Sequence, residues 1–455
     1  MEKKIVVIGG GPGGYSAAIK AAQLGAQVTL AEPCSMGGTC LNVGCIPTKA
    51  LLHSCEFYHK IKSGAVPGVK ANAVIDWVEM QNYKEALIGQ LTGGVSALLR
   101  HNGVQLLEEK AFPLPGGKVK IGSAELAADA VILATGSVSV KPNFPGAETK
   151  GVIDSAEALA LGEIPKSLVI VGGGVIGVEF ATLFSRLGTQ VTVLEILSEI
   201  LPTFDAEATD CLHEKLESDG VKIYTEALLT SVAKSPSGLT ACFKQKDAEH
   251  RLETDYVLVA AGRRPNTDEL GLDPLGVKTV KGAVEVDRNF RTNLPGLYAV
   301  GDCNGENMLA HAAIAQGITA AGHIMGDSIR YNPKIVPRCC YSSPEIAAVG
   351  MTEKQVKDSG LEYSVGLFNL SGNGKAQIDG GGGFVKIIAD KLLGEILGVH
   401  IIGPSATEMI GEAAVCMSME GTVEDIYSTI HSHPTVSEAI GEAAMSVFGK
   451  PLHGV

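Results

Sequence analysis

The residues best suited to chemistry are two cysteines, Cys40 and Cys45, within the run G-G-T-C-L-N-V-G-C-I-P-T-K at residues 37–49. A disulfide between them would close a small loop, which suits a bond made and broken in each reaction cycle better than a stabilising one. Lys49 lies one helical turn after Cys45 and leads into A-L-L-H-S-C-E-F, which we expect to be a helix. Its charge and the positive end of that helix would favour Cys45 as the thiolate.

Two other interpretations explain this cysteine pair less well. A zinc site would draw on the N-terminal cysteines, which are Cys34, Cys40, Cys45 and Cys55. Their gaps lack the paired short spacing of zinc ligands, so no metal is expected. Inert apolar packing suits several later cysteines, namely Cys211, Cys242, Cys303 and Cys416, but not a pair surrounded by glycines.

The elements before the cysteines predict a nucleotide site. Residues 4–32 read as an apolar strand, a glycine turn, an alanine-rich helix and a second strand, which is a βαβ unit. Gly9, Gly11 and Gly14 supply G-x-G-x-x-G, which permits a tight turn and close approach of a pyrophosphate. Glu32 ends the second strand, where its carboxylate can accept hydrogen bonds from ribose hydroxyls. A degenerate fold without a ligand is the alternative.

The same unit recurs at residues 168–195, where Gly172, Gly174 and Gly177 form a second fingerprint. Glu195 ends its second strand, and a carboxylate there would repel the 2′-phosphate of NADP, so NAD is favoured. Two fingerprints in one chain indicate two dinucleotides, one of which can reduce the other.

Three later segments look like closures of these sites. The runs at 130–137 and 257–266 are apolar strands that end in small residues, and the run at 295–302 places Asp302 directly after a strand and Gly301. Asp302 could bind a polyol hydroxyl there. Each signal is weak alone, because strand–Gly–Asp turns are usually structural.

The bulk composition fits such a protein. The chain has 455 residues, 45% hydrophobic and 19% charged, with 56 glycines, which indicates a multidomain α/β protein. Its net charge of -13 argues against nucleic-acid or anionic-membrane partners. Without a signal peptide or a long apolar stretch, a cytoplasmic location is expected. In that reducing compartment the ten cysteines do not form a structural disulfide framework.

Taken together, these motifs resemble the flavoprotein disulfide reductases, and most closely their dihydrolipoamide dehydrogenase branch. The resemblance rests on G-G-G-P-G-G, the cysteine run, the second fingerprint, Y-A-V-G-D, M-L-A-H at 308–311 and L-G-V-H-I-I-G-P at 397–404. It covers nearly the whole chain. It implies two Rossmann-like α/β domains, for FAD and NAD, followed by an α+β dimerisation domain.

The resemblance also implies roles for individual residues. Cys40 exchanges with substrate, Cys45 lies against the flavin, and Lys49 lies near the flavin N5, paired with Glu179. FAD contacts are expected from Gly9, Gly11, Gly14, Glu32, Pro33, Gly38, Thr39, Lys49, Ala111, Thr135, Gly136, Asp302 and Ala310. NAD contacts are expected from Gly172, Gly174, Gly177, Glu195, Val232, Gly262 and Arg263.

Near the C-terminus, H-S-H-P-T-V-S-E at 431–438 is similar to a motif of that family. A histidine five residues before a glutamate is by itself a weak signal. By the resemblance, His433 is the acid/base and Glu438 orients it, and His433 of one chain serves Cys40 of the other in a homodimer.

The implied reaction is oxidation of protein-bound dihydrolipoamide to lipoamide with reduction of NAD⁺. Because the first fingerprint starts at residue 9, we expect the lipoyl group to come from a partner protein, which the sequence does not assign to a 2-oxoacid dehydrogenase complex, an acetoin dehydrogenase or the glycine cleavage system. Glutathione-reductase-like and mercuric-reductase-like enzymes are alternatives. A catalytically inactive nucleotide-binding scaffold or NADH sensor is another, although it would need none of the reactive residues.

The expected domains are an FAD domain at 1–147, an NAD domain at 148–265, a segment completing the FAD site at 266–335 and an interface domain at 336–455. Cys339 and Cys340 stand where the family usually has apolar β-branched residues. They could form a second thiol relay, but alternation along a strand would point them to opposite faces, which favours packing.

Overall fold

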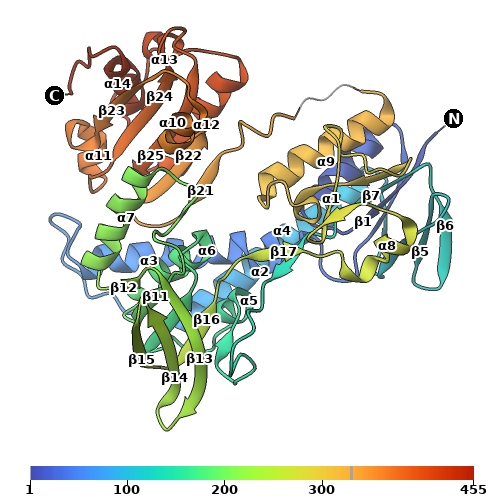
Figure 1. Ribbon diagram of the computed structural model, residues 1–455, viewed down its shortest axis with the longest axis horizontal. Coiled ribbons are helices and arrows are strands. Elements are labelled where there is room, and N and C mark those ends of the chain that lie inside the picture. The colour runs from blue at the N-terminus through green and yellow to red at the C-terminus, as the bar shows by residue number, and fades with distance from the viewer. Residues whose placement is uncertain (1, 328–330, 455) are drawn as a thin grey trace.

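The computed structural model describes residues 2–327 and 331–454. Figure 1 shows three lobes: a first α/β unit around β1 and α1, a second around α6 and β16, and a C-terminal domain above the second unit. The chain returns from the second unit to the first before it enters the C-terminal domain. The expected α/β fold with a C-terminal α+β domain is confirmed.

The first unit is built on a parallel sheet of apolar strands. In spatial order these are β20 (Leu297–Ala299), β7 (Ala130–Leu133), β1 (Lys4–Ile8), β2 (Gln27–Ala31) and β3 (Gln105–Leu107). Four of the five residues of β1 and of β2 are buried, as expected for strands covered on both faces. The chain order reverses between β1 and β7, and such a switch point is where open parallel sheets bind ligands.

The second unit repeats this plan. Its parallel sheet has the order β12 (Lys222–Tyr224), β11 (Gln190–Leu194), β10 (Ser167–Val171), β16 (Tyr256–Val259) and β9 (Val152–Ile153). The β10–α6–β11 segment is therefore the counterpart of β1–α1–β2.

Smaller antiparallel sheets flank these cores. They are formed by β4 (Ala111–Leu114), β5 (Lys118–Ile121) and β6 (Ala124–Ala127); by β13 (Ala227–Ser235), β14 (Gly238–Gln245) and β15 (Ala248–Thr254); by β8 (Ser137–Ser139) and β17 (Arg263–Pro265); and by β18 (Thr279–Val280) and β19 (Ala283–Val284). The β8–β17 pair carries the chain back from the second unit to the first.

Helices cover the faces of both units. They are α1 (Pro12–Gln23), α2 (Gly38–Val43), α3 (Cys45–Lys62), α4 (Trp77–His101), α5 (Ser155–Leu159), α6 (Val175–Arg186), α7 (Ala206–Ser218), α8 (Leu272–Leu275) and α9 (Ala310–Met325). No helix of the described ranges combines the length and apolar character needed to cross a membrane.

The C-terminal domain is an antiparallel sheet with helices packed on it. Its strands, in spatial order, are β21 (Arg338–Cys340), β22 (Glu345–Gly350), β25 (Ile396–Gly403), β24 (Phe384–Asp390) and β23 (Tyr363–Asn369). Its helices are α10 (Glu353–Ser359), α11 (Gly374–Ile378), α12 (Ala406–Ser418), α13 (Val423–Ser428) and α14 (Glu438–Val447).

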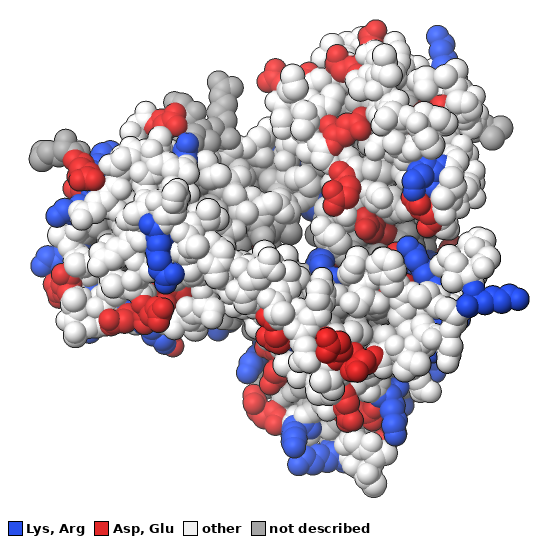
Figure 2. Space-filling view, turned by 180° about the vertical axis from the view of Figure 1, so that it is seen from behind, with Lys and Arg blue, Asp and Glu red and all other residues white. Residues whose placement is uncertain are grey.

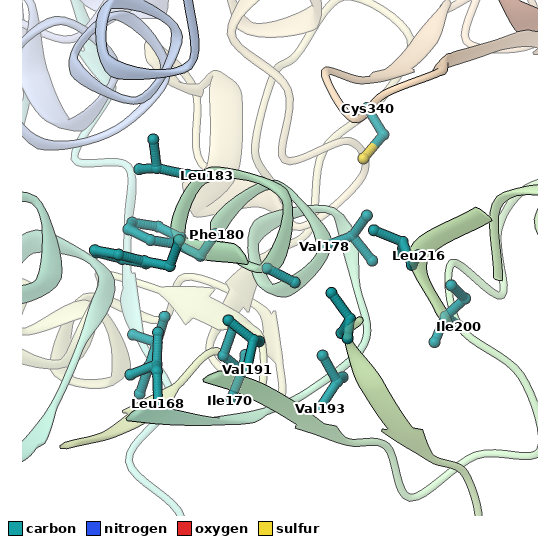
Figure 3. Packing of buried hydrophobic residues seen from close by; sticks show 14 of the residues in the cluster. Leu168, Ile170, Val178, Phe180, Leu183, Val191, Val193, Ile200, Leu216 and Cys340 are labelled. Atoms are coloured by element: carbon teal, nitrogen blue, oxygen red, sulfur yellow. The ribbon is translucent and has the colours of Figure 1, made fainter. Parts of the chain in front are cut away.

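One apolar cluster joins the second unit to its neighbours. Figure 3 shows α6 lying over the sheet that carries Leu168 and Ile170, with Val178 beside Leu216 of α7 and with Cys340 of β21 on the other side of the helix from the sheet. Cys340 is fully buried and acts there as a small apolar residue, whereas Cys339 is only partly buried and packs against a different cluster. The two thiols therefore lie in different surroundings, as the alternation of a strand requires.

Candidate active site

The two thiols are positioned by a break between short helices. Cys40 lies on α2, and Cys45 is the first residue of α3, which starts earlier than the Ala50 expected from the sequence. Pro47 does not prevent this, because proline is tolerated in the first turn of a helix. Gly44 separates the helices, and a Cβ there would lie 2.9 Å from the Thr39 carbonyl oxygen, so the turn requires glycine.

The surroundings divide the two sulfurs electrostatically. A hydrogen bond with Cys40, followed by the charge of Lys49, lowers the pKa of Cys45 to about 7, against the opposing effect of burial. The same thiol hydrogen bond and then burial raise the pKa of Cys40 well above its usual range. Of the two, Cys45 is therefore the better thiolate and the better leaving group.

Lys49 is fixed by a carboxylate from the second unit. Its Nζ donates to both oxygens of Glu179 on α6, at 2.8 and 2.7 Å, and the Glu179 side chain is only 4% exposed. Burial alone would lower the pKa of Lys49, but Glu179 outweighs it, so the pKa is raised and Lys49 is charged. Tyr341 completes the arrangement, since its backbone N–H donates to Glu179 Oε1 at 3.0 Å and Lys49 Nζ lies 4.7 Å from its ring centroid.

These groups line one large cavity of about 1810 Å³ that runs between the glycine turns of both units. Drug-sized ligands occupy roughly 300–1,000 Å³, so the cavity has room for more than one such molecule. Figure 2 shows the molecule hollowed where its lobes meet, with acidic and basic side chains interspersed over that face.

Most of the expected cofactor residues line this cavity. They are Gly9, Gly11, Glu32, Pro33, Gly38, Thr39, Lys49, Ala111, Thr135, Gly136, Asp302, Ala310, Gly172, Gly174, Glu195, Gly262 and Arg263. Cys40, Cys45 and Glu179 line it as well. Residues from the beginning, middle and later part of the chain therefore meet around one space.

The glycines of each fingerprint have distinct structural reasons. A Cβ at Gly14 would lie 1.9 Å from the Gly9 carbonyl oxygen, and one at Gly177 equally close to that of Gly172, so these positions serve helix packing. A Cβ at Gly174 would meet nothing within 4 Å and would project into the open cavity. The middle glycine thus leaves space for a ligand, which fits a dinucleotide pyrophosphate at the start of the helix.

Glu32 and Glu195 hold the two glycine turns in the same way. Glu32 accepts from the backbone N–H groups of Gly10 and Cys34, at 2.7 and 3.0 Å. Glu195 accepts from Gly173 and Leu197, at 2.6 and 2.8 Å. The sequence predicted these acids as ribose acceptors, but it gave no sign that they also fix the turns.

A second polar group sits at the first turn. Asp302 accepts a hydrogen bond from Ser137 Oγ at 2.5 Å, and Ser137 in turn accepts one from Arg263 Nε at 2.7 Å.

Two residues that were expected to bind NAD have well-defined partners within the chain. Arg263 donates to the side chain and carbonyl oxygen of Ser137, because β17 pairs with β8 of the first unit. Val232 is buried, donates its N–H to the Pro145 carbonyl and does not reach the described cavity wall. The start of the same strand, at Ala227, lines the cavity instead. Sequence reasoning missed the lining residues Arg338 and Tyr341, which no motif marks, and it expected Cys339, which also lines the cavity, to serve only packing.

The histidine–glutamate pair lies on the C-terminal domain. His433 Nδ1 and Glu438 Oε1 are 2.9 Å apart, and a hydrogen bond from the Thr435 N–H, then the histidine, lowers the pKa of Glu438. The His433 side chain is 81% exposed and is not part of the described wall of the cavity that holds Cys40. Among the described residues of the same chain, none forms a hydrogen bond with the other ring nitrogen, Nε2. In the described ranges, no cluster of three or more His, Cys, Asp or Glu side chains is arranged to hold a metal.

Comparisons with known proteins agree with this geometry. A model of the pyridine nucleotide-disulphide oxidoreductases matches residues 3–317, and one of their dimerisation domain matches residues 336–444. The chain is 43% identical to a dihydrolipoyl dehydrogenase of Bacillus subtilis, covering 99% of both chains, and 40% identical to that of Geobacillus stearothermophilus, covering 100% and 98%. Among solved structures, LpdA of Mycobacterium tuberculosis superimposes with a TM-score of 0.90 at 28% identity, over 97% of this chain and 99% of that one.

Proposed function

The chain belongs to the pyridine nucleotide-disulphide oxidoreductase family, and from this membership we propose that it is a dihydrolipoyl dehydrogenase. It oxidises dihydrolipoamide to lipoamide and reduces NAD⁺ to NADH. The observation that carries this proposal is the position of Cys45: a low-pKa thiol beside Lys49 and Glu179, in a cavity shared by two nucleotide-binding turns.

FAD and NAD are the cofactors. The first glycine turn, Glu32 and Asp302 would hold FAD, and the second turn with Glu195 would hold NAD. The open space at Gly174 supports this fit. The chemistry that bound FAD supplies is two-electron transfer between a thiolate and a nicotinamide, which no side chain of the protein provides.

The thiol steps are assigned to the chain's own residues. His433, oriented by Glu438, removes a proton from a dihydrolipoamide thiol, and that sulfur attacks Cys40 of the oxidised disulfide. A mixed disulfide forms at Cys40, and the electron pair of the broken bond leaves on Cys45 as a thiolate. The second substrate thiol then attacks the mixed disulfide, which releases lipoamide and leaves Cys40 as a thiol.

The charge left on Cys45 is stabilised by Lys49. Glu179 keeps that lysine protonated and fixes its Nζ, so the cation does not need to reorganise when the thiolate forms. Once lipoamide has left, the raised pKa of Cys40 keeps that sulfur protonated while Cys45 carries the charge. The two sulfurs thus perform different tasks because their surroundings differ.

The enzyme is a homodimer, and we propose that each active site uses both subunits. The exposure of His433 and its place outside the Cys40 cavity support a role for it in the partner's site. We also propose the domain division 1–147, 148–265, 266–335 and 336–455. The return of β20 to the first sheet supports assigning the third segment to the FAD half.

We propose that dihydrolipoamide reaches the enzyme on a separate lipoyl-bearing protein. This partner would be the lipoyl protein of a 2-oxoacid or acetoin dehydrogenase complex, or of the glycine cleavage system. Purified lipoyl proteins of each class, compared as substrates at equal concentration, would identify it by the highest kcat/KM.

One assay tests the activity. The purified protein is offered lipoamide, oxidised glutathione or mercuric ion, each with NADH and with NADPH. We expect turnover with lipoamide and NADH. Turnover of glutathione or mercuric ion alone would contradict the assignment, and a yellow protein that bleaches with NADH but never reduces lipoamide would indicate a sensor.

Cys45→Ser tests the thiol mechanism. The variant should retain FAD but lose dihydrolipoamide turnover, because the mixed disulfide at Cys40 can no longer form. Cys211→Ser, at a partly buried position on α7 outside the described cavity wall, is the control and should keep activity. Full activity of Cys45→Ser would exclude the mechanism.

A further inference from the structure

A buried lysine of the C-terminal domain binds the second nucleotide unit. Lys386 of β24 is 1% exposed, although it is charged. Its Nζ donates to Asp205 Oδ1 at 2.9 Å and Glu353 Oε2 at 2.7 Å, and Glu207 Oε2 lies 3.3 Å away. Asp205 and Glu207 belong to the second unit, whereas Glu353 belongs to the C-terminal domain. A lysine is rarely buried unless it is paired, so this cluster has to be satisfied across the domain boundary.

The Asp205 side chain binds the C-terminal domain instead of capping its own helix. Asp205 precedes the first residue of α7, where an aspartate ordinarily accepts from the N–H groups of its own helix. Its side chain makes no such bond. Instead Oδ1 accepts from Lys386, and Oδ2 accepts from the backbone N–H of Glu353 at 2.9 Å. Figure 1 shows α7 extending from the second unit to the sheet of the C-terminal domain, next to β25.

The segment immediately before Asp205 is the loop 196–204, which lines the cavity at residues 196–197 and 201–204. Leu201, 1% exposed, has φ of 48°, a left-handed conformation that is strained for leucine and persists only when its surroundings impose it. Its N–H donates to the carbonyl of Gly173 at 2.9 Å, within the second glycine turn.

The loop and that turn are in close contact. A Cβ at Gly173 would lie 2.8 Å from Ile200 Cγ2, so the loop is seated directly on the turn. Figure 3 shows Ile200 beside Leu216 of α7, which ties the loop to the helix that Asp205 begins. The strained loop is thus held at one end by Glu195 and at the other by Asp205.

From this arrangement we propose that Lys386 is a positioning residue for the NAD site: it fixes Asp205 from the C-terminal domain and so holds the loop 196–204 against the second glycine turn. The proposal rests on the proposed function only in assigning NAD to that turn. It makes affinity for the nicotinamide cofactor dependent on a domain that otherwise serves pairing of subunits.

The test compares Lys386→Met with Lys391→Met, in the intact enzyme with FAD bound. Lys391 follows the same strand, pairs with Glu362 and is 62% exposed, so it matches the loss of charge without the buried cluster. Reduction of the flavin is followed against NADH concentration. Hydrogen exchange of residues 196–205 is measured without nucleotide, and flavin reduction by dihydrolipoamide is measured separately.

In Lys386→Met we expect the half-saturating NADH concentration to rise roughly tenfold while the limiting rate and the reaction with dihydrolipoamide stay unchanged. Exchange in the loop should accelerate. Lys391→Met should behave as the unmodified enzyme. Asp205→Asn keeps the shape of the side chain but removes its charge, should shift NADH half-saturation in the same direction, and serves as the test if Lys386→Met does not fold.

Unchanged NADH half-saturation and loop exchange in the folded variants would overturn the proposal. The proposal would also be overturned if flavin reduction by NADH, flavin reduction by dihydrolipoamide and the amount of bound FAD all fell equally. That pattern would indicate a loss of general stability rather than of positioning. Failure of the proposed function is distinguishable, since an enzyme inactive with dihydrolipoamide would still show the NADH effect.

Discussion

Replacing Lys49 with methionine should raise the pKa of Cys45 and expose the electrostatic origin of its reactivity. The pKa of Cys45 is lowered from 9.0 to about 7, first by the hydrogen bond with Cys40 and then, against burial, by Lys49. A shift of two units corresponds to about 2.7 kcal/mol and raises the thiolate fraction at pH 7 from about 1% to about 50%. The substitution removes the cation and leaves Glu179, whose charge also raises the Cys45 pKa.

The size of the effect follows from these contributions. A neighbouring opposite charge shifts a pKa by about one to three units, and the lower end applies because Glu179 already neutralises Lys49. A rise of about one unit would reduce the Cys45 thiolate at pH 7 about fivefold. The double variant Lys49→Met, Glu179→Gln also loses the buried carboxylate. Its Cys45 pKa should therefore lie between that of the unmodified enzyme and that of Lys49→Met.

The assay is alkylation of the reduced enzyme with iodoacetamide between about pH 5 and pH 10, with the Cys45 peptide quantified by mass spectrometry. Lys60→Met is the matched control, because Lys60 lies on the same helix and pairs with Glu56 at the surface. An unchanged alkylation profile in Lys49→Met, or an equal shift in the control, would refute the electrostatic argument.

Three further predictions concern the shared site, the cofactor preference and acid stability. If His433 serves the partner's Cys40, a mixture of His433→Gln and Cys40→Ser subunits that reassort freely should recover about a quarter of normal lipoamide turnover, and no recovery would place both residues in one subunit. Glu195→Gln should reduce the NADH-to-NADPH ratio of kcat/KM by roughly tenfold, since it removes the charge facing a 2′-phosphate; an unchanged ratio would exclude that cause. Lys357, then Lys386, lowers the pKa of Glu353 from 4.5 to about 2, so its stabilisation is present above pH 4.5 and lost as the pH falls through 2. Urea unfolding should show a loss of at most about 2 kcal/mol over that range that is absent in Glu353→Gln.

Local patterns in the sequence were sufficient for the two nucleotide units. Each requires a strand, a glycine turn and a helix within some thirty residues, and the third glycine of each turn is required by an atom nearby in the chain, as Gly14 is by the carbonyl oxygen of Gly9. The sequence analysis placed the start of the helix near Ala50, whereas α3 starts at Cys45, with Pro47 in its first turn, where proline is tolerated.

Contacts between distant segments required either the resemblance or the structure. The Lys49–Glu179 pair joins residues 130 positions apart, and only the family pattern suggested it before the structure placed the two side chains 2.7 Å apart. Tyr341 on Lys49 carries no motif, so its contact could not be found from spacing. The roles of these side chains in turnover stay predictions until the variants are measured.

The contacts of Arg263 and Lys386 could not be predicted from the sequence of the domain that each belongs to, because their partners lie in another domain. Arg263 ends the second unit in the chain, yet its side chain binds Ser137 of the first, because the return strand pairs there. Lys386 has no partner predictable from β24, since Asp205 lies 181 residues earlier. In both cases one unit supplies the charged side chain, and a different unit supplies the hydrogen-bonding partner that fixes its position. Function in this enzyme should therefore be sensitive to substitutions at domain junctions whose own motifs predict nothing, and the NADH dependence of Lys386→Met measures that sensitivity directly.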